Sequence, residues 1–292
     1  LSILIPCFNA SMHISNCLDS LIANDFNHDD YEILVIDGGS DDGTLKLLND
    51  YLNRYSFIKV INNPNRTKSA ALNIGINESV GDIIMRIDVH AVYNKNYIST
   101  LVDSLYSEGV DNAGGVRDTY IPVNGSSMEI AISLMISNPL IVGNAFYRTG
   151  ALPKKRLVDS VFCGCYKKKA FDKIGLFNES LIRTQDREFN LRLINSGGKI
   201  LLNPETRCTY FPRTKFLEYL SWNFNGAKWL GYARKFTNTK MLSPRNYIPV
   251  VFSLYIFLLP IVIFQKANIH LSLIMFLILI VPLITYFLIM LK

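Results

Sequence analysis

The feature that most constrains the fold is a regular alternation of short apolar runs and amphipathic stretches over residues 2–88. Each apolar run has the length of a buried strand, and each stretch between them has the spacing of a helix. Strands are expected at residues 2–6, 31–37, 57–62 and 82–88, and helices at residues 10–24, 42–53 and 66–79. Parallel strands need such crossover helices. We therefore predict an α/β fold whose sheet is mostly parallel, with flanking helices on both faces.

Polar side chains follow these strands at the edge where open α/β sheets bind ligands, beyond the carboxyl ends of the strands. Pro6, Asp37 and the stretch Asp88-Val89-His90 lie there. Asp88 and His90 flank Val89, so both side chains can face one side, and a carboxylate with an imidazole can hold a divalent cation. That cation could in turn hold a diphosphate. The alternative is a strand-ending Asp beside a surface His, but the second carboxylate, Asp37, favours a nucleotide-type ligand.

Three common motifs are absent from the sequence. No Gly-x-Gly-x-x-Gly follows the first strand, which argues against a dinucleotide-dependent dehydrogenase, and no Gly-x4-Gly-Lys-Ser/Thr occurs, which disfavours a P-loop enzyme. A diphosphate would then need a cation in place of a glycine cradle. The five cysteines include no Cys-x-x-Cys pair, so we expect free thiols in a reducing compartment and no zinc site.

The second half of the chain has a less regular pattern. Strands are expected at residues 113–122, 158–162 and 199–203, and helices at residues 168–174 and 184–193. Asp186 lies in the first turn of the last of these helices. It is either an acid stabilised by the helix dipole or a general base that projects into the ligand cleft, and the sequence by itself favours the dipole interpretation.

The C-terminal part of the chain has the pattern of a membrane-associated segment. Residues 215–236 are rich in aromatic and basic side chains and contain both tryptophans. This mixture suits a helix in the membrane interface, and it equally suits a helix that packs on the domain. Two apolar runs follow, at residues 247–264 and 271–291, each near the ~20 residues that a spanning helix needs. We expect these runs to form a transmembrane helical hairpin.

The net charge of +6 is unevenly distributed along the chain. Residues 246–292 carry +2 and residues 226–245 carry +5, which leaves −1 for residues 1–225. The high isoelectric point is therefore no argument for nucleic acid, and we expect no nucleic-acid partner. The basic stretch precedes the apolar runs, where anionic lipid head groups would be its partner. By the positive-inside rule, we expect a multi-pass protein of the cell membrane with its large domain in the cytoplasm.

Five motifs occur in a fixed order along the chain. They are Pro-x-aromatic-Asn at residues 6–9, the Asp-Gly-Gly-Ser loop that starts at residue 37, Ala-x-Asn-x-Gly at residues 71–75, Asp88-Val89-His90 where an Asp-x-Asp is usual, and Gln185-Asp186 in place of Glu-Asp. Together they resemble glycosyltransferase family 2, inverting enzymes with the Rossmann-like GT-A fold. We thus expect a GT-A catalytic domain, an interfacial aromatic and basic helical segment and two transmembrane helices, at residues 1–213, 214–245 and 246–292.

The resemblance implies a role for each matching residue. Phe8 and Asp37 would contact the uracil, Asp88 the ribose and the cation, and His90 would ligate the cation in place of the usual Asp. The implied nucleotide-sugar-binding residues are Pro6, Phe8, Asn9, Asp37, Asp88 and Val89, and the implied metal ligands are Asp88 and His90. Asp186 would take the proton from the acceptor hydroxyl. The cation would be Mn²⁺ or Mg²⁺, and the softer imidazole shifts the preference toward Mn²⁺.

A narrower resemblance concerns the substrate. Residues 86–93, 138–144 and 162–166 resemble the succinoglycan-type exopolysaccharide glucosyltransferases, which carry Asp-x-His-Ala in place of Asp-x-Asp. This implies transfer of a hexose, with glucose favoured, from a UDP-sugar to a lipid-linked saccharide in exopolysaccharide or cell-surface polysaccharide synthesis. The alternatives are a processive polysaccharide synthase, a polyprenyl-phosphate sugar transferase and a non-catalytic nucleotide-sugar-binding membrane protein. Residues 225–229 only approximate the Gln-x-x-Arg-Trp motif of processive enzymes.

Overall fold

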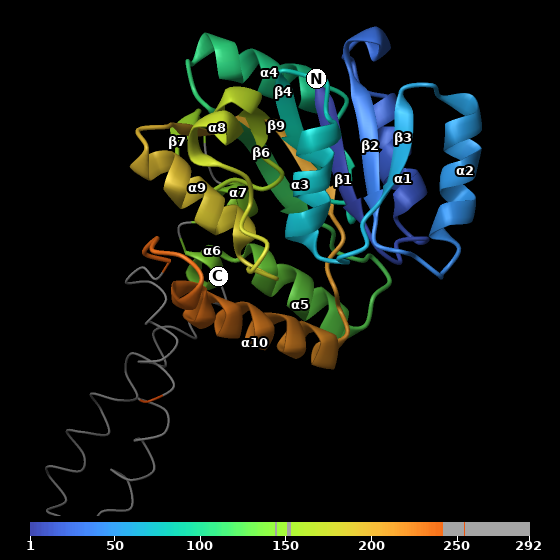
Figure 1. The fold of residues 1–292 in the computed structure, drawn as a ribbon. Coiled ribbons are helices and arrows are strands. Elements are labelled where there is room, and N and C mark those ends of the chain that lie inside the picture. Colours follow the sequence, from blue (N-terminus) through green and yellow to red (C-terminus); the bar gives the residue numbers. More distant parts are fainter. Residues whose placement is uncertain (144, 151–152, 242–253, 255–292) are drawn as a thin grey trace, which may run out of the picture. The chain divides into compact units, whose positions relative to one another are not determined.

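The structure is a computed structural model that describes residues 1–143, 145–150, 153–241 and 254 (Figure 1). Its first compact unit is Leu1–Met241, and residues Leu242–Lys292 form a second unit. Within the described residues, no helix combines the length and the apolar character needed to cross a bilayer. The helical hairpin predicted for residues 246–292 lies outside the described residues, apart from Leu254.

Four parallel strands form the N-terminal half of the sheet, in the order β3-β2-β1-β4. These strands are β1 (Ser2–Cys7), β2 (Glu32–Asp37), β3 (Ile58–Asn62) and β4 (Ile83–Arg86). The helices between them are α1 (Ile14–Ile22), α2 (Thr44–Arg54) and α3 (Lys68–Glu78). The predicted strand–helix rhythm of residues 2–88 is thus confirmed, with shorter helices than expected.

The C-terminal half turns the sheet into a mixed one. Beyond β4 the order continues as β8-β6-β9-β5, and β7 also pairs with β9. The strands are β5 (Ala91–Tyr93), β6 (Asn112–Thr119), β7 (Arg156–Leu157), β8 (Cys165–Lys167) and β9 (Ile200–Tyr210). The pairs β4–β8, β6–β8, β5–β9 and β7–β9 are antiparallel, and β6–β9 is parallel. The prediction of a mostly parallel sheet therefore holds only for the first four strands.

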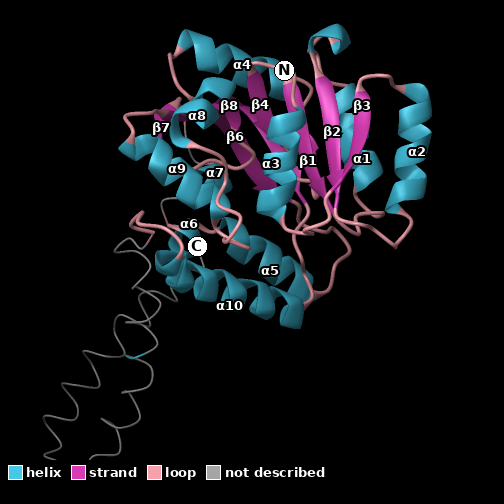
Figure 2. Cartoon of the chain, in the orientation of Figure 1, coloured by secondary structure: helices cyan, strands magenta, loops and turns pink. Residues whose placement is uncertain are grey.

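Helices cover both faces of this sheet (Figure 2). Side chains alternate along β1, so Ile3 and Ile5 lie on one face of the sheet. There they pack with residues of α1, α2 and α4 (Tyr97–Ser107). Leu4 points to the other face, where it packs with α3, α8 (Lys168–Ile174) and α9 (Gln185–Asn195). Both faces of β1 and β2 are buried, which explains why the residues between the ends of each strand are apolar.

Except for α7, the remaining helices lie along the lower side of the first unit in Figure 1. They are α5 (Ser127–Ser137), α6 (Pro139–Val142), α7 (Phe146–Thr149) and α10 (Phe216–Tyr232), and two 3₁₀ turns lie at His28–Asp30 and Ala233–Lys235. α10 packs along α5, and α7 packs against β6. The long helix predicted for residues 215–236 is thus present, whereas the strand predicted for residues 158–162 is absent.

Candidate active site

Asn9 and Asp37 join two loops at the carboxyl edge of the parallel strands. Asn9 adopts a left-handed conformation (φ 47°). Its backbone N–H donates to Ser40 Oγ (2.8 Å), and its side-chain amide exchanges two hydrogen bonds with Asp41. Asp37 is only 3% exposed and accepts from the backbone N–H groups of Gly39 and Ser40 and from Ser40 Oγ. These bonds hold the loop after β2 against the loop after β1.

The two loops leave Phe8 at the surface with half of its area exposed. Its ring lies beside Gly38, where an added Cβ would approach Phe8 Cδ2 to 3.3 Å. An exposed aromatic face next to a fixed loop can stack on a nucleobase. The Asp37 carboxylate, in contrast, is engaged by its own loop. Contact of Pro6, Phe8, Asn9 and Asp37 with the nucleotide stays a prediction.

Asp88 and His90 lie together just past the end of β4, as their spacing suggested. Asp88 Oδ2 pairs with Lys68 Nζ (3.0 Å), and Asp88 Oδ1 accepts from the His90 backbone N–H (3.1 Å). Burial opposes ionisation of Asp88, but Lys68 and His90 hold its pKa below the usual range. Burial lowers the pKa of His90 to about 4, although Asp88 acts in the opposite direction. The Val89 side chain is buried in the core, so only its backbone can reach a ligand.

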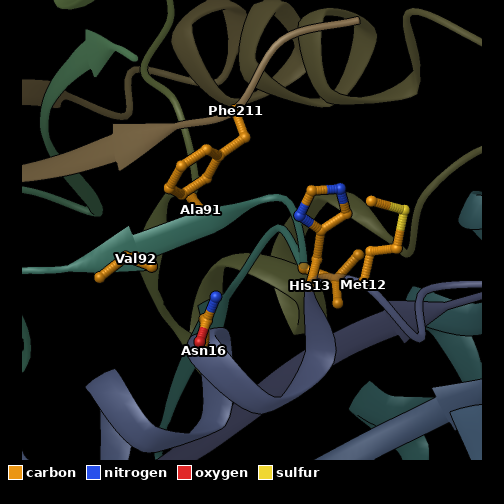
Figure 3. Close-up of a pocket in the computed structure, with 7 residues that line it drawn as sticks. Met12, His13, Asn16, Ala91, Val92 and Phe211 are labelled. Carbon is orange, nitrogen blue, oxygen red and sulfur yellow. The ribbon is translucent and has the colours of Figure 1, made fainter. Parts of the chain in front are cut away.

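A second imidazole, His13, lies beside His90. The two rings meet edge to face with centroids 4.7 Å apart, and the His13 ring is directed toward Phe211, 6.1 Å away between centroids (Figure 3). A pocket of about 150 Å³ opens here between the start of α1 and β5, with Met12 and Asn16 among the residues that line it. The Phe211 backbone N–H donates to the His90 carbonyl (2.9 Å), which fixes the end of β9 to the candidate cation site.

Asp186 and Arg86 form an ion pair at the end of β4, two residues before Asp88. Arg86 is the last residue of β4 and is buried, whereas the Asp186 side chain is 36% exposed, and Arg86 Nη1 lies 3.1 Å from Asp186 Oδ2. Asp186 is in the first turn of α9, as predicted. Burial would raise the pKa of Asp186, but Arg86 and then Lys68 outweigh it and keep that pKa below its usual value. The carboxylate is thus ionised and partly open to solvent.

Sequence reasoning missed three partners of the site residues. The sequence could have indicated a partner for Arg86, because a charged residue in a buried strand needs a counter-charge. The sequence offered no indication for Lys68 and His13, since no local pattern places them against Asp88 and His90. Their positions follow from the sheet order, which sets α1 and α3 next to the end of β4.

The chemistry of this donor set fits a divalent cation. An ionised carboxylate and a neutral imidazole are both ready to coordinate, and together they suit Mn²⁺ or a similar borderline ion. No group of three or more His, Cys, Asp or Glu side chains able to hold a metal occurs among the described residues. A cation held by Asp88 and His90 would therefore take its other ligands from the nucleotide and from water.

These features define an α/β domain with an ionised carboxylate beside a candidate cation site. Residues 2–175 match the model of the family described as Glycosyl transferase family 2. Because the match spans more than half of the chain, the protein belongs to this family and is a glycosyltransferase.

Two curated relatives match most of the chain. One is the dolichyl N-acetyl-alpha-D-glucosaminyl phosphate 3-beta-D-2,3-diacetamido-2,3-dideoxy-beta-D-glucuronosyltransferase of Methanococcus voltae, 28% identical over 88% of this chain and 81% of its own. The other is the succinoglycan biosynthesis protein ExoA of Rhizobium meliloti (strain 1021), 27% identical over 86% of this chain and 76% of its own.

A solved structure confirms the fold class. The mannosyltransferase PcManGT of Pyrobaculum calidifontis, in complex with GDP-mannose and Mn²⁺, aligns with a TM-score of 0.60 and 16% identity over 86% of this chain and 67% of its own. At this identity the likeness concerns the fold alone. The expected GT-A-like α/β architecture is thereby confirmed.

Proposed function

We propose that this glycosyltransferase moves a hexose, with glucose favoured, from a UDP-sugar to a lipid-linked saccharide, with inversion at the anomeric carbon. The observation that supports this is the Arg86–Asp186 pair, which holds an ionised carboxylate beside the strand end that carries Asp88 and His90. An ionised, partly exposed carboxylate can accept the proton of an attacking hydroxyl. A buried and neutral Asp186 could not.

Each residue of the site has its own role in the proposed reaction. Asp186 takes the proton from the acceptor hydroxyl as its oxygen attacks the anomeric carbon from the face opposite the leaving diphosphate. Phe8 and the loop fixed by Asp37 hold the nucleobase. Asp88 and His90 would hold the divalent cation, which when bound neutralises the charge of the departing diphosphate. Arg86 keeps Asp186 oriented and charged.

The acceptor class is supported by the relatives. The Methanococcus voltae relative is named for a dolichyl-linked sugar phosphate, and the Rhizobium meliloti relative is named for the biosynthesis of succinoglycan, a polysaccharide. Both names agree with a saccharide acceptor used in polysaccharide or glycan assembly. We therefore assign the lipid-linked class of acceptor to this chain as part of the proposal.

Membrane association completes the proposed function, since a lipid-linked acceptor resides in a bilayer. An exposed apolar stripe on α10, formed by Leu217, Leu220 and Phe224, supports it. These residues are spaced three and four apart and share one helix face. With the basic stretch and the apolar runs that follow, we propose a multi-pass protein of the cell membrane with its catalytic unit in the cytoplasm.

A transfer assay tests the proposal. Membranes that contain the full-length protein are incubated with Mn²⁺, extracted lipid-linked oligosaccharides and a panel of UDP-sugars, with GDP-mannose as the comparison donor. We expect one hexose to be added from one UDP-sugar, and transfer by the Asp186→Asn variant to be slower by roughly 10²–10⁴. Donor binding without transfer from any sugar nucleotide would exclude this function, and a long product would indicate a processive synthase.

A further inference from the structure

Four arginines near the candidate active site lack a carboxylate partner among the residues that the structure describes. They are Arg117, Arg148, Arg183 and Arg213, and we refer to them as the arginine cluster. The ion pairs of the described residues involve other cations, namely Lys59, Lys68, Arg86, Lys155, Arg192, Arg207 and Lys215. Arginine stays charged at any physiological pH, so the cluster carries uncompensated positive charge.

Arg117 forms the floor of the cluster. It lies on β6 with 4% of its surface exposed, and its Nε and Nη2 atoms are buried without a hydrogen-bond partner among the described residues. Its guanidinium lies 4.6 Å from the ring centroid of Tyr210, with Phe162 and Tyr147 next to it. Aromatic faces stabilise this cation only in part. An isolated buried charge normally requires a counter-ion.

Arg148 lies above the same aromatic group. It is on α7, where its Nε donates to the Tyr147 hydroxyl (3.2 Å) and its guanidinium lies 5.5 Å from the centroid of that ring. Arg117 and Arg148 lie 6.0 and 5.5 Å from the centroid of the same Tyr147 ring, so the two charges are close, and burial and Arg148 both lower the pKa of Arg117. The negative charge of Asp186 also contributes to raising the pKa of Arg148.

Arg183 and Arg213 border the other side of the site. Arg183 precedes Asp186 by three residues, and its Nη1 donates to the Trp222 carbonyl of α10 (3.0 Å). Arg213 follows β9, whose end is fixed to His90 by the Phe211 backbone. Burial and then Arg213 lower the pKa of Arg183. Arg183 thus precedes the helix that carries Asp186, and Arg213 follows the segment whose Phe211 backbone is hydrogen-bonded to His90.

The charges of the donor do not account for the cluster. A nucleotide diphosphate brings two negative charges, and its divalent cation brings two positive ones. Lys68 is paired with Asp88, and Arg86 is paired with Asp186. The buried Arg117 is thus left without a counter-charge among the described residues, and a second anion would supply one. Guanidinium groups match the oxygen geometry of phosphate, which they bind through two parallel hydrogen bonds.

We propose that Arg148, Arg183 and Arg213, above the buried Arg117, bind the phosphate or diphosphate that links the acceptor saccharide to its lipid. This inference rests on the proposed function and names the group of the acceptor that the enzyme recognises. Arg183 lies three residues before Asp186, so the proposal places the anion close to the reacting hydroxyl. The acceptor is then a short lipid-linked saccharide, and not the distant end of a polymer.

A binding titration tests the cluster separately from catalysis. Farnesyl diphosphate and farnesol are titrated into the full-length protein in dodecyl maltoside with EDTA, so that no cation can bridge the diphosphate to Asp88 and His90. We expect farnesyl diphosphate to bind at least about tenfold more tightly than farnesol, a difference of about 1.4 kcal/mol. Arg148→Gln and Arg213→Gln should each weaken the diphosphate about tenfold and leave farnesol unchanged. Arg54→Gln, an exposed change on α2, is the matched control.

Three results would overturn the inference. Equal binding of farnesyl diphosphate to wild type and to both arginine variants would show that the cluster does not hold it. A loss in Lys68→Gln without a loss in the arginine variants would move the diphosphate to the donor site. In phosphatidylcholine nanodiscs, abolition of farnesyl diphosphate binding by added phosphatidylglycerol would assign the arginines to bilayer head groups. Failure of hexose transfer from every donor would instead reject the proposed function and leave this titration interpretable.

Discussion

At the scale of single residues, the enzyme assignment depends on Asp186. Asp186→Asn keeps the shape and one acceptor oxygen for Arg86 but removes the ability to take a proton. Turnover should fall by roughly 10²–10⁴, the usual range for a general base. UDP-sugar affinity, measured by calorimetry, should stay close to wild type, because the proposed role of Asp186 concerns the acceptor and not the donor. Near-normal turnover in this variant would make Asp186 a structural residue of the first turn of α9.

Arg86 tests whether the ion pair sets the charge of that base. In wild type the pKa of Asp186 is below its usual value, so the base remains ionised across the neutral range. Arg86→Met removes the largest influence that lowers this pKa, and burial then raises it. The acid limb of the pH profile of kcat should therefore move to higher pH, with activity lost as pH falls through the new pKa.

The control for Arg86 is the double variant Arg86→Met/Asp186→Asn. Its residual activity should show no acid limb from this group, since no carboxylate remains to titrate. Melting curves of both variants identify any loss of fold. An acid limb that does not move in Arg86→Met would mean that another group governs the profile.

Asp88 and His90 are tested through cation-dependent donor binding. Even the outer partners of metal ligands change affinity about 10- to 100-fold when they are removed, so a direct ligand should cost at least as much. We expect His90→Ala to weaken the enhancement of UDP binding by Mn²⁺ by that factor and Asp88→Ala to abolish it. Titration of UDP by calorimetry with and without Mn²⁺ provides the measurement. An undiminished Mn²⁺ effect in both variants would remove these residues from the cation site.

At the scale of elements, the sequence predicts best where the pattern is set by burial on both faces. The first four strands are predicted correctly because β1, β2 and β4 each contain a run of apolar residues that is buried on both faces. Residues 158–162 have the composition of a strand, but Val161 lies against Gly114 of β6, where an added Cβ would collide with it. The apolar residues of this segment pack onto the sheet instead of joining it, and no local pattern distinguishes the two.

The long strand β9 shows a second limit of local patterns. The sequence predicts a strand only for residues 199–203, because Pro204 cannot donate a hydrogen bond within a sheet. In the structure β9 continues to Tyr210, since the pairing with β6 jumps from Gly115–Asn203 to Val116–Arg207 and leaves Pro204 in the irregular part. This extension brings Tyr210 and Phe211 to His90. Part of the candidate site thus depends on a register shift that the sequence does not reveal.

α10 is the element on which membrane contact can be measured directly. Both tryptophans of the chain, Trp222 and Trp229, lie on it, so intrinsic fluorescence reports on this helix alone. In nanodiscs with brominated phosphatidylcholine, we expect strong quenching of the tryptophan emission of the full-length protein. Leu217 and Phe224 are 77% and 71% exposed, and the double change Leu217→Asp/Phe224→Asp should reduce the quenching severalfold.

The matched control for α10 is Val80→Asp, an equally exposed apolar position outside this helix. It should leave the quenching unchanged, since Val80 lies in the loop before β4. Absence of quenching in the unmodified protein would show that α10 packs only on the domain, which is the other interpretation that the sequence allows. Quenching that survives the double change would mean that a different face of α10 contacts the lipid.

At the scale of the whole molecule, the cysteines make the expected topology testable. All five are free and buried, and burial raises the pKa of Cys7 to about 12 and that of Cys163 to about 11. Buried thiols with such pKa values react slowly with maleimides, because the thiolate is the nucleophile. A single cysteine introduced at an exposed position should therefore dominate labelling without removal of the native ones.

The last prediction concerns residues 246–292, where the sequence leads us to expect a hairpin with both ends in the cytoplasm. Asn268→Cys, between the two apolar runs, should react with a membrane-impermeant maleimide added to intact cells. Asn49→Cys, exposed on α2 of the catalytic unit, should react only after permeabilisation. If Asn268→Cys also requires permeabilisation, residues 246–292 do not cross the bilayer, and the lipid-linked acceptor must be reached from a segment that lies along the cytoplasmic surface.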